Sequence, residues 1–246
     1  MKYTSYHFPP LTKGVLIKRY KRFLADVKLE TGEILTVHCP NSGSMKGCAI
    51  PGSTIWLSTS DNSKRKYRYT WELIQIPETI IGINTLLPNK LVKQSIENGE
   101  IEELSGYNRV KAEVKTSTHT RLDLLLEKNT GEKCYVEIKN CTLVEDQIAM
   151  FPDAVTLRGQ KHLEELEHLV SLGNRGIIFF LIQRMDAKLF KPAYMIDKTY
   201  GEKLEKAVKN GVELITRDTV IDTNAIRIRK FVPYDLFLNK TPDKQL

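Results

Sequence analysis

Short extended segments joined by turns make up the first third of the chain. Strand-like runs over residues 15–22, 23–29, 34–38, 54–58 and 65–76 are mostly separated by clusters of Gly, Pro, Asn, Asp and Ser, which predicts strands with tight connections. Four to six short strands in about 70 residues are typical of a small closed barrel, and the OB fold is favoured. An SH3-like barrel would give a similar pattern.

The hydrophobic pattern changes after residue 82. Apolar residues take helical spacing over 86–97, 156–172 and 197–210, and a glycine that can end a helix follows each stretch. Strand candidates occupy 109–115, 121–127, 132–139, 177–183 and 212–216. This order of elements predicts an α/β domain with a mixed sheet. We therefore expect a barrel in residues 1–82 and an α/β domain in residues 83–246.

Basic residues are concentrated in the predicted barrel. The chain of 246 residues is 41% hydrophobic and 27% charged, as in ordinary globular proteins, and has a net charge of +7. Residues 1–82 hold 12 of the 37 Lys and Arg but only 6 of the 30 Asp and Glu, which leaves 25 against 24 for the rest. A basic module joined to a nearly neutral one favours a polyanionic partner.

The cysteines and the apolar runs bear on the compartment. Cys39, Cys48, Cys134 and Cys141 form no C-x-x-C pair and fit no common zinc spacing, so reduced thiols in the cytoplasm are the simplest interpretation. The first residues lack an apolar signal core, and no run reaches the roughly 18 apolar residues of a membrane helix. We expect a cytoplasmic protein without a membrane partner, and a homo-oligomer stays possible.

A hairpin in the α/β domain carries the candidate chemistry. Asn129-Thr130-Gly131 is a turn signal between two strands. If the hairpin is symmetric about Thr130, Leu125 faces Tyr135 and Asp123 faces Glu137, and alternation places Asp123, Glu137 and Lys139 on one face.

Two carboxylates about 5 Å apart repel each other by about 3 kcal/mol at an effective dielectric constant near 20. A divalent cation, Mg²⁺ or Mn²⁺, would reverse the sign, with the Ile138 carbonyl as a further ligand. Lys139 would then hold or help deprotonate water, or balance transition-state charge. An ordinary solvated strand face is the alternative, because a bare E-x-K is very common.

Other residues are candidates for the same site. If the preceding turn centres on Thr118, Glu113 lies opposite Asp123 and is a further metal ligand, although a surface Glu fits the sequence equally well. Arg158 and Lys161 begin the helix after the hairpin and could meet phosphate there; a polar first helical turn is the plainer interpretation.

The barrel offers candidates for nucleic-acid binding. Cations and aromatic residues are interleaved around the first strand and again over residues 64–71. In an extended strand over 64–71, the cations would lie on one face and the aromatic rings on the other. Cations track phosphates, and aromatic rings stack bases. The candidates are Lys18, Arg19, Lys21, Arg22, Lys64, Lys66, Tyr67 and Arg68. The alternative is that the rings fill the barrel and the cations are merely solvated.

Several strings resemble a known family. They are R-Y-K-R-F-L-A-D-V (19–27), H-C-P-N-S-G-S-M (38–45), S-D-N-S-K-R-K-Y (60–67), T-W-E-L (70–73), E-L-S-G-Y (103–107) and F-P-D-A-V-T-x-R-G-Q-K-H-L (151–163). Together they resemble the sugar fermentation stimulation protein family, SfsA, over almost the whole chain.

The resemblance implies an OB-like barrel, a restriction-endonuclease-like domain similar to the PD-(D/E)xK nucleases, and DNA binding. By motif, Asp123, Glu137 and Lys139 are the nuclease-like positions, although Leu122 replaces the Pro that often precedes the first of them. Pro152-Asp153 follows the E-x-K and is not the motif's own pair.

Two functions compete. The first is a metal-dependent nuclease that hydrolyses phosphodiester bonds in DNA, with RNA not excluded. The second is a non-catalytic, largely sequence-independent DNA-binding regulator of sugar metabolism genes. A small-molecule enzyme of sugar metabolism is disfavoured, because the chain has neither a Gly-rich phosphate loop nor a dinucleotide-binding fingerprint.

Overall fold

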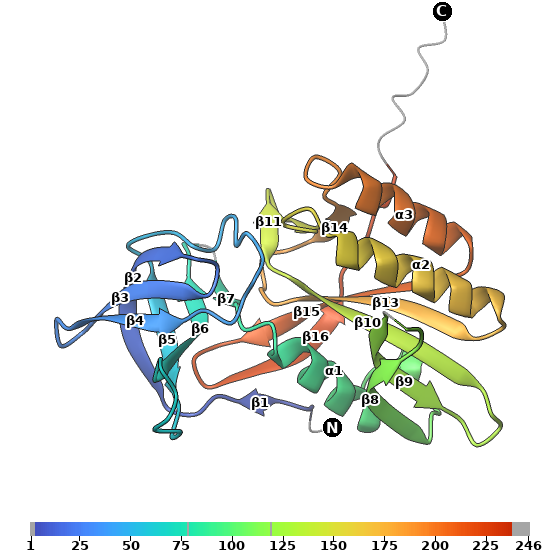
Figure 1. Cartoon of the computed structure of the whole chain (residues 1–246), viewed down its shortest axis with the longest axis horizontal. Helices are drawn as coiled ribbons and strands as arrows, with labels where there is room; N and C mark the ends of the chain where they lie inside the picture. Colours follow the sequence, from blue (N-terminus) through green and yellow to red (C-terminus); the bar gives the residue numbers. More distant parts are fainter. Residues whose placement is uncertain (1–2, 78, 119, 238–246) are drawn as a thin grey trace, which may run out of the picture.

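The computed structural model describes residues 3–77, 79–118 and 120–237. A small barrel and a larger α/β domain lie side by side (Figure 1). The barrel strands are β2 (Leu11–Tyr20), β3 (Leu24–Leu29), β4 (Ile34–His38), β5 (Thr54–Thr59), β6 (Tyr69–Gln75) and β7 (Ile80–Gly82).

The barrel has OB topology. Its strand order is β4-β3-β2-β5-β6-β7, and a parallel bridge from His38 in β4 to Thr70 in β6 closes the sheet on itself. Alternate residues fill the interior, where Val27, Ile55, Leu57 and Trp71 are fully buried. The predicted OB-like barrel is confirmed.

The larger domain is built on a seven-stranded mixed sheet in the order β1-β16-β15-β13-β10-β9-β8. Strands β10, β13 and β15 run parallel to one another, and the other pairs are antiparallel. The strands are β1 (Tyr6–His7), β8 (Arg109–Lys115), β9 (Arg121–Glu127), β10 (Lys133–Cys141), β13 (Arg175–Ile182), β15 (Glu213–Ile221) and β16 (Ala225–Phe231). The predicted α/β domain with a mixed sheet is confirmed.

Helices cover both faces of this sheet (Figure 1). Helix α1 (Leu87–Glu97) covers one face, and α2 (Leu157–Ser171) and α3 (Lys198–Lys209) cover the other. Strand β13 supplies both cores: Phe179 packs on the α1 side and Phe180 on the α2–α3 side. A continuous apolar run is therefore needed there, because the strand is buried on both faces.

Several elements differ from the sequence predictions. The run over 65–76 becomes a strand only from Tyr69, and residues 61–68 form an irregular connection. Strands β1 and β16 were not predicted, and β1 joins the N-terminus to the sheet of the C-terminal domain. Also unpredicted were a 3₁₀ turn (Glu102–Leu104) and a three-stranded sheet of β11 (Leu143–Glu145), β12 (Ile148–Phe151) and β14 (Leu189–Pro192).

Within the described ranges, no helix combines the length and apolarity required to cross a membrane.

Candidate metal centre and its cleft

The hairpin of β9 and β10 places the first candidate acid. Gly131 in the turn has φ +90°, a conformation that glycine adopts without strain. The register is the predicted one, with Leu125 opposite Tyr135, and the ladder ends at the pair Leu124–Val136. Beyond that pair the strands separate, and the Asp123 carboxylate accepts a hydrogen bond from the Ile138 backbone N–H at 2.8 Å. The side chain thus uses a backbone donor that the ladder leaves free.

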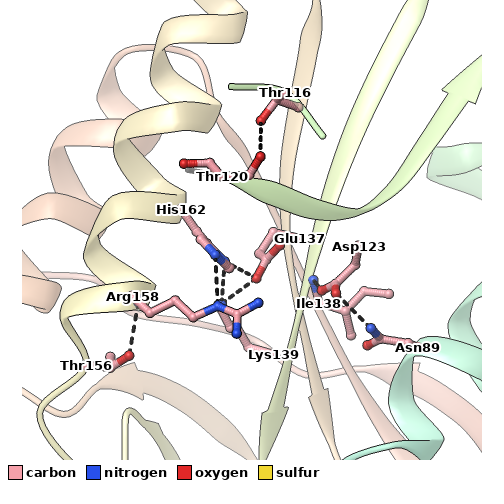
Figure 2. A network of polar contacts seen from close by, with 11 residues as sticks. Asn89, Thr116, Thr120, Asp123, Glu137, Ile138, Lys139, Thr156, Arg158 and His162 are labelled. Atoms are coloured by element: carbon pink, nitrogen blue, oxygen red, sulfur yellow. Dashed lines mark hydrogen bonds and ion pairs between the residues drawn. The ribbon is translucent and has the colours of Figure 1, made fainter. Parts of the chain in front are cut away.

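Asp123 is also held from the helix side. Its second oxygen accepts a hydrogen bond from the Asn89 amide of α1 at 2.7 Å. Figure 2 shows the carboxylate between Asn89 and the Ile138 backbone. Both contacts orient the carboxylate, but neither brings a positive charge.

Glu137 lies at the centre of a polar cluster on the α2 side of the sheet. The ammonium of Lys139 donates to Glu137 Oε1 at 2.6 Å, and the His162 imidazole makes a short contact with the same oxygen. Glu137 is 3% exposed, and its Oε2 is buried without a hydrogen-bond partner among the described residues.

His162 is a member of the cluster that sequence reasoning missed. Its Nε2 accepts from the Arg158 Nε–H at 3.3 Å, so the ring proton belongs on Nδ1, from which it donates to Glu137. Both residues lie on α2, four positions apart and therefore on one helix face (Figure 2). That spacing was visible in the sequence, but nothing in it placed the helix against β10.

The two acids have opposite electrostatic environments. Burial, and then repulsion from Glu137, raise the pKa of Asp123 to about 6. Burial acts to raise the pKa of Glu137 as well, but attraction to Lys139 and the contacts with His162 outweigh it and hold this pKa below its usual range. Asp123 is therefore the acid whose negative charge is poorly compensated.

This arrangement fits a divalent cation. Two carboxylates, one with an unpartnered buried oxygen, supply the hard oxygen ligands that Mg²⁺ and Mn²⁺ prefer. These residues do not form a closed site in which protein side chains supply all the ligands. The described part of the chain contains no group of three or more His, Cys, Asp and Glu that could hold a metal. A site of two carboxylates that leaves positions for water and substrate phosphate matches the usual protein environment of Mg²⁺.

The cluster opens into a cleft of about 620 Å³ between the two domains. One wall is the barrel loop of residues 40–45, which we call the 40–45 loop. Arg22, from the turn between β2 and β3, lines the cleft as well. The other walls come from the start of α1, the ends of β9 and β10, the segment 150–156 and Arg158 of α2. Asp123, Glu137 and Lys139 all line this one cleft, although the ladder ends before the expected Asp123–Glu137 pair.

Glu113, which the sequence placed in the site, lies outside the cleft. The register does set it across from Asp123, between the pairs Ala112–Leu124 and Val114–Leu122. Its φ is +58°, however, and its exposed carboxylate forms an ion pair with Arg121 at 2.9 Å. The backbone twist turns the side chain to solvent, which removes it as a ligand.

The predicted nucleic-acid-binding residues separate into two groups. Arg19, Arg22 and Arg158 line the cleft, whereas exposed Lys161, on the same helix as Arg158, does not. The other barrel candidates lie away from it: Lys18, Lys21, Lys64, Lys66, Tyr67 and Arg68.

The expected alternation of cations and rings over 64–71 fails, because residues 64–68 precede the strand. Trp71 fills the barrel core, and Lys66 covers the Tyr67 ring at 5.4 Å.

Arg19 has a structural role that the sequence did not show. Its guanidinium donates to the carbonyl oxygens of Asn41, Gly43 and Ser44 at 2.9, 2.8 and 3.2 Å. These bonds use most of its donors and organise the 40–45 loop rather than leave the charge free for phosphate.

Comparisons with known proteins identify the family. The N-terminal OB domain model of SfsA matches residues 17–83, and the sugar fermentation stimulation protein RE domain model matches residues 86–225. Sugar fermentation stimulation protein homologs from Pelobacter propionicus and Geobacter sulfurreducens are 54% and 53% identical, over 92% and 91% of this chain and 97% and 96% of theirs.

A solved structure agrees with both matches. Pyrococcus furiosus SfsA, described in complex with Ca²⁺, is 28% identical, superposes with a TM-score of 0.86, and the match covers 94% of this chain and 98% of that one. The barrel and the α/β domain therefore recur together in a relative with the same overall fold. This chain belongs to the sugar fermentation stimulation protein family.

Proposed function

We propose that this protein is a divalent-metal-dependent nuclease that hydrolyses phosphodiester bonds, with DNA as its partner. The observation that carries the proposal is the buried Glu137 carboxylate, which has one unpartnered oxygen and lies with Asp123 and Lys139 on the floor of a cleft lined by arginines. A purely structural role leaves the arrangement unexplained, because burying a carboxylate without full pairing is costly.

Asp123 and Glu137 would hold the cation, Mg²⁺ or Mn²⁺. When bound, the cation would supply Lewis-acid polarisation of a phosphate oxygen. The pKa of Asp123, about 6, keeps this carboxylate mostly ionised at neutral pH, although a positive charge nearby would favour the ionised form further. His162 and Lys139 fix the Glu137 carboxylate through one oxygen, so that the other is left for a further ligand.

Lys139 would act on the reacting groups directly. Its ammonium has three donors and contacts Glu137 Oε1 at 2.6 Å and His162 Nδ1 at 3.2 Å. Its side chain is 11% exposed and lines the cleft. From there it orients water or balances the charge that builds on phosphate oxygens. Arg22 and Arg158, on opposite walls, would bind the flanking phosphates.

The Pyrococcus furiosus relative supports a cation site, because its structure is described as a complex with Ca²⁺. Calcium and magnesium both take oxygen ligands, so a carboxylate site that binds one is a reasonable candidate for the other. The four cysteines support the proposed cytoplasmic setting, since all are buried free thiols.

Cleavage assays with matched variants test the proposal. We expect Mg²⁺- or Mn²⁺-dependent degradation of DNA by the purified protein, lost in Asp123→Asn and Glu137→Gln. Glu113→Gln is the matched control, because this acid lies on the strand next to Asp123 but points to solvent, and it should cleave like the wild type. The absence of metal-dependent cleavage of any DNA or RNA would contradict the proposal and favour a non-catalytic DNA-binding regulator.

A further inference from the structure

The wall that the barrel contributes to the cleft is held by the barrel itself and by the segment that follows it, residues 83–85. Arg19 supplies three hydrogen bonds to the loop, and the Asn41 side chain adds two more. The Asn41 Nδ2 donates to the Ile83 carbonyl at 3.2 Å, and its Oδ1 accepts from the Gly43 N–H at 2.8 Å. Thr85 Oγ1 donates to the Pro40 carbonyl at 2.6 Å. The 40–45 loop is thus fixed by hydrogen bonds along most of its length.

The same wall is fastened to the other domain. The Asp153 carboxylate, from the segment after β12, accepts from the Met45 N–H at 2.9 Å and the Ser44 hydroxyl at 3.3 Å. The two domains approach so closely that a Cβ on Gly43 would lie 2.6 Å from Asp153 Oδ2. A side chain at position 43 would have to displace the Asp153 carboxylate. We call the contact between Asp153 and the 40–45 loop the Asp153 clamp.

A second fastening lies where the chain leaves the barrel. The Gly82 N–H donates to the Gln183 carbonyl at 2.9 Å, and the Gln183 amide donates to the Asn84 carbonyl at 3.3 Å. With the Asp153 clamp, these contacts join the domains at two places. Opening the cleft by domain rotation would have to break one of these two sets of hydrogen bonds.

The cleft is small for a double helix. Its volume of about 620 Å³ lies in the range of pockets that hold a small ligand, so a duplex has no room inside it. Glu137 at the floor is 3% exposed, so a phosphate must enter the cleft to approach it. A single strand meets this condition because its backbone can enter without a paired partner.

The charges suit the same occupant. Arg22 and Arg158 face the cleft from the barrel and from α2, and both are exposed, as needed to track a phosphate backbone. We propose that the interdomain cleft accepts one strand of nucleic acid and that the Asp153 clamp excludes the duplex. This inference rests on the proposed function, since it names the substrate class of the same site.

Binding without metal tests the inference separately from cleavage. In EDTA, a labelled oligodeoxynucleotide is titrated with the full-length protein, both as a single strand and annealed to its complement. We expect the single strand to bind at least about tenfold more tightly. Arg22→Ala and Arg158→Ala should each weaken single-strand binding several-fold, while their controls Lys21→Ala and Lys161→Ala, whose side chains lie outside the cleft, should not. The inference would be overturned if the single strand and the duplex bound equally tightly. It would also be overturned if the arginine variants and their lysine controls lost the same amount of single-strand affinity.

Variants of the clamp test its part in strand selection. Asp153→Ala removes the acceptor of the 40–45 loop, and Gly43→Ala wedges the same contact apart. Both should raise duplex binding relative to single-strand binding, with folding checked by thermal melting. Unchanged selectivity in both folded variants would refute the role of the clamp.

The two proposals can fail independently. Selective single-strand binding without cleavage under any metal would refute the nuclease alone. Equally fast cleavage of both forms would refute strand selection and leave the nuclease standing.

Discussion

Replacing Asp123 by Asn should stabilise the protein in the absence of metal. Asn resembles the protonated carboxyl and keeps an oxygen for the Ile138 N–H, while the Asn89 amide can rotate to accept from the new donor. The change removes a charge that burial and Glu137 disfavour. A variant that gains stability when a proposed metal-binding carboxylate is removed indicates that the ionised carboxylate is destabilised by its surroundings in the absence of metal.

The magnitude follows from the shift of the pKa. It rises from 3.8 to about 6 on folding, and at 1.36 kcal/mol per unit the difference amounts to about 3 kcal/mol. The folded state binds the proton of Asp123 more tightly than the unfolded state does. The stability of the wild type relative to the variant is therefore highest below pH 3.8, and it decreases by about 3 kcal/mol as the pH rises through about 6. The advantage of Asp123→Asn is therefore full above pH 7 and roughly half as large at pH 5.

Thermal melting in EDTA at pH 7.5 and pH 5 measures this difference. For a chain of this length we expect Asp123→Asn to melt several degrees above the wild type at pH 7.5, by about 2–4 °C per kcal/mol. Added Mg²⁺ should raise the melting temperature of the wild type but not of the variant.

Glu137→Gln provides the opposite case. Lys139 and His162 stabilise this carboxylate and hold its pKa low, so removing the charge should destabilise the protein by about 3 kcal/mol or more. The ionised Glu137 contributes this stability above its ordinary pKa of 4.5, and the contribution disappears as the pH falls below that value. The destabilisation by Glu137→Gln is therefore full at pH 7.5.

If Asp123→Asn instead melted at or below the wild type at pH 7.5, the claim that the charge of Asp123 is poorly compensated would be refuted.

Further predictions concern the residues around the site. His162→Ala should weaken Mg²⁺ binding about 10–100-fold, measured by Mg²⁺-dependent melting, and His162→Gln should restore most of it because an amide N–H can donate to Glu137. Arg19→Ala should lower the free energy of unfolding by about 1–3 kcal/mol and speed amide exchange in the 40–45 loop, which loses three hydrogen bonds. Leu166→Ala, which truncates a fully buried side chain on the inner face of α2, should cost about 2–5 kcal/mol in denaturant unfolding.

The hairpin of β9 and β10 could be predicted because its determinants are local. The Asn-Thr-Gly turn fixes the register, and alternation along β10 then fixes the face on which Glu137 and Lys139 lie. The helices α1, α2 and α3 could be predicted for the same reason, since each has an apolar face and a glycine near its end. Local signals of this kind need no knowledge of the neighbouring elements.

Glu113 shows where the same reasoning stops. The register that places it across from Asp123 is correct, but its positive φ turns the side chain toward Arg121. Sequence alternation assumes regular extended backbone, and no residue near Glu113 signals a departure from it. Register can therefore be inferred from a turn, whereas side-chain direction needs the local backbone angles.

The remaining parts of the site depend on contacts between distant segments, which sequence patterns do not show. His162 contacts Glu137 because α2 packs across β10, and the 40–45 loop is joined to the C-terminal domain through Asp153. The hairpin alone offers two acids and an amine on an open strand end. Helix α2 adds the residue that fixes Glu137, and the barrel adds a wall that narrows the approach. The cleft is lined by both domains, and the relatives match this chain across both of them.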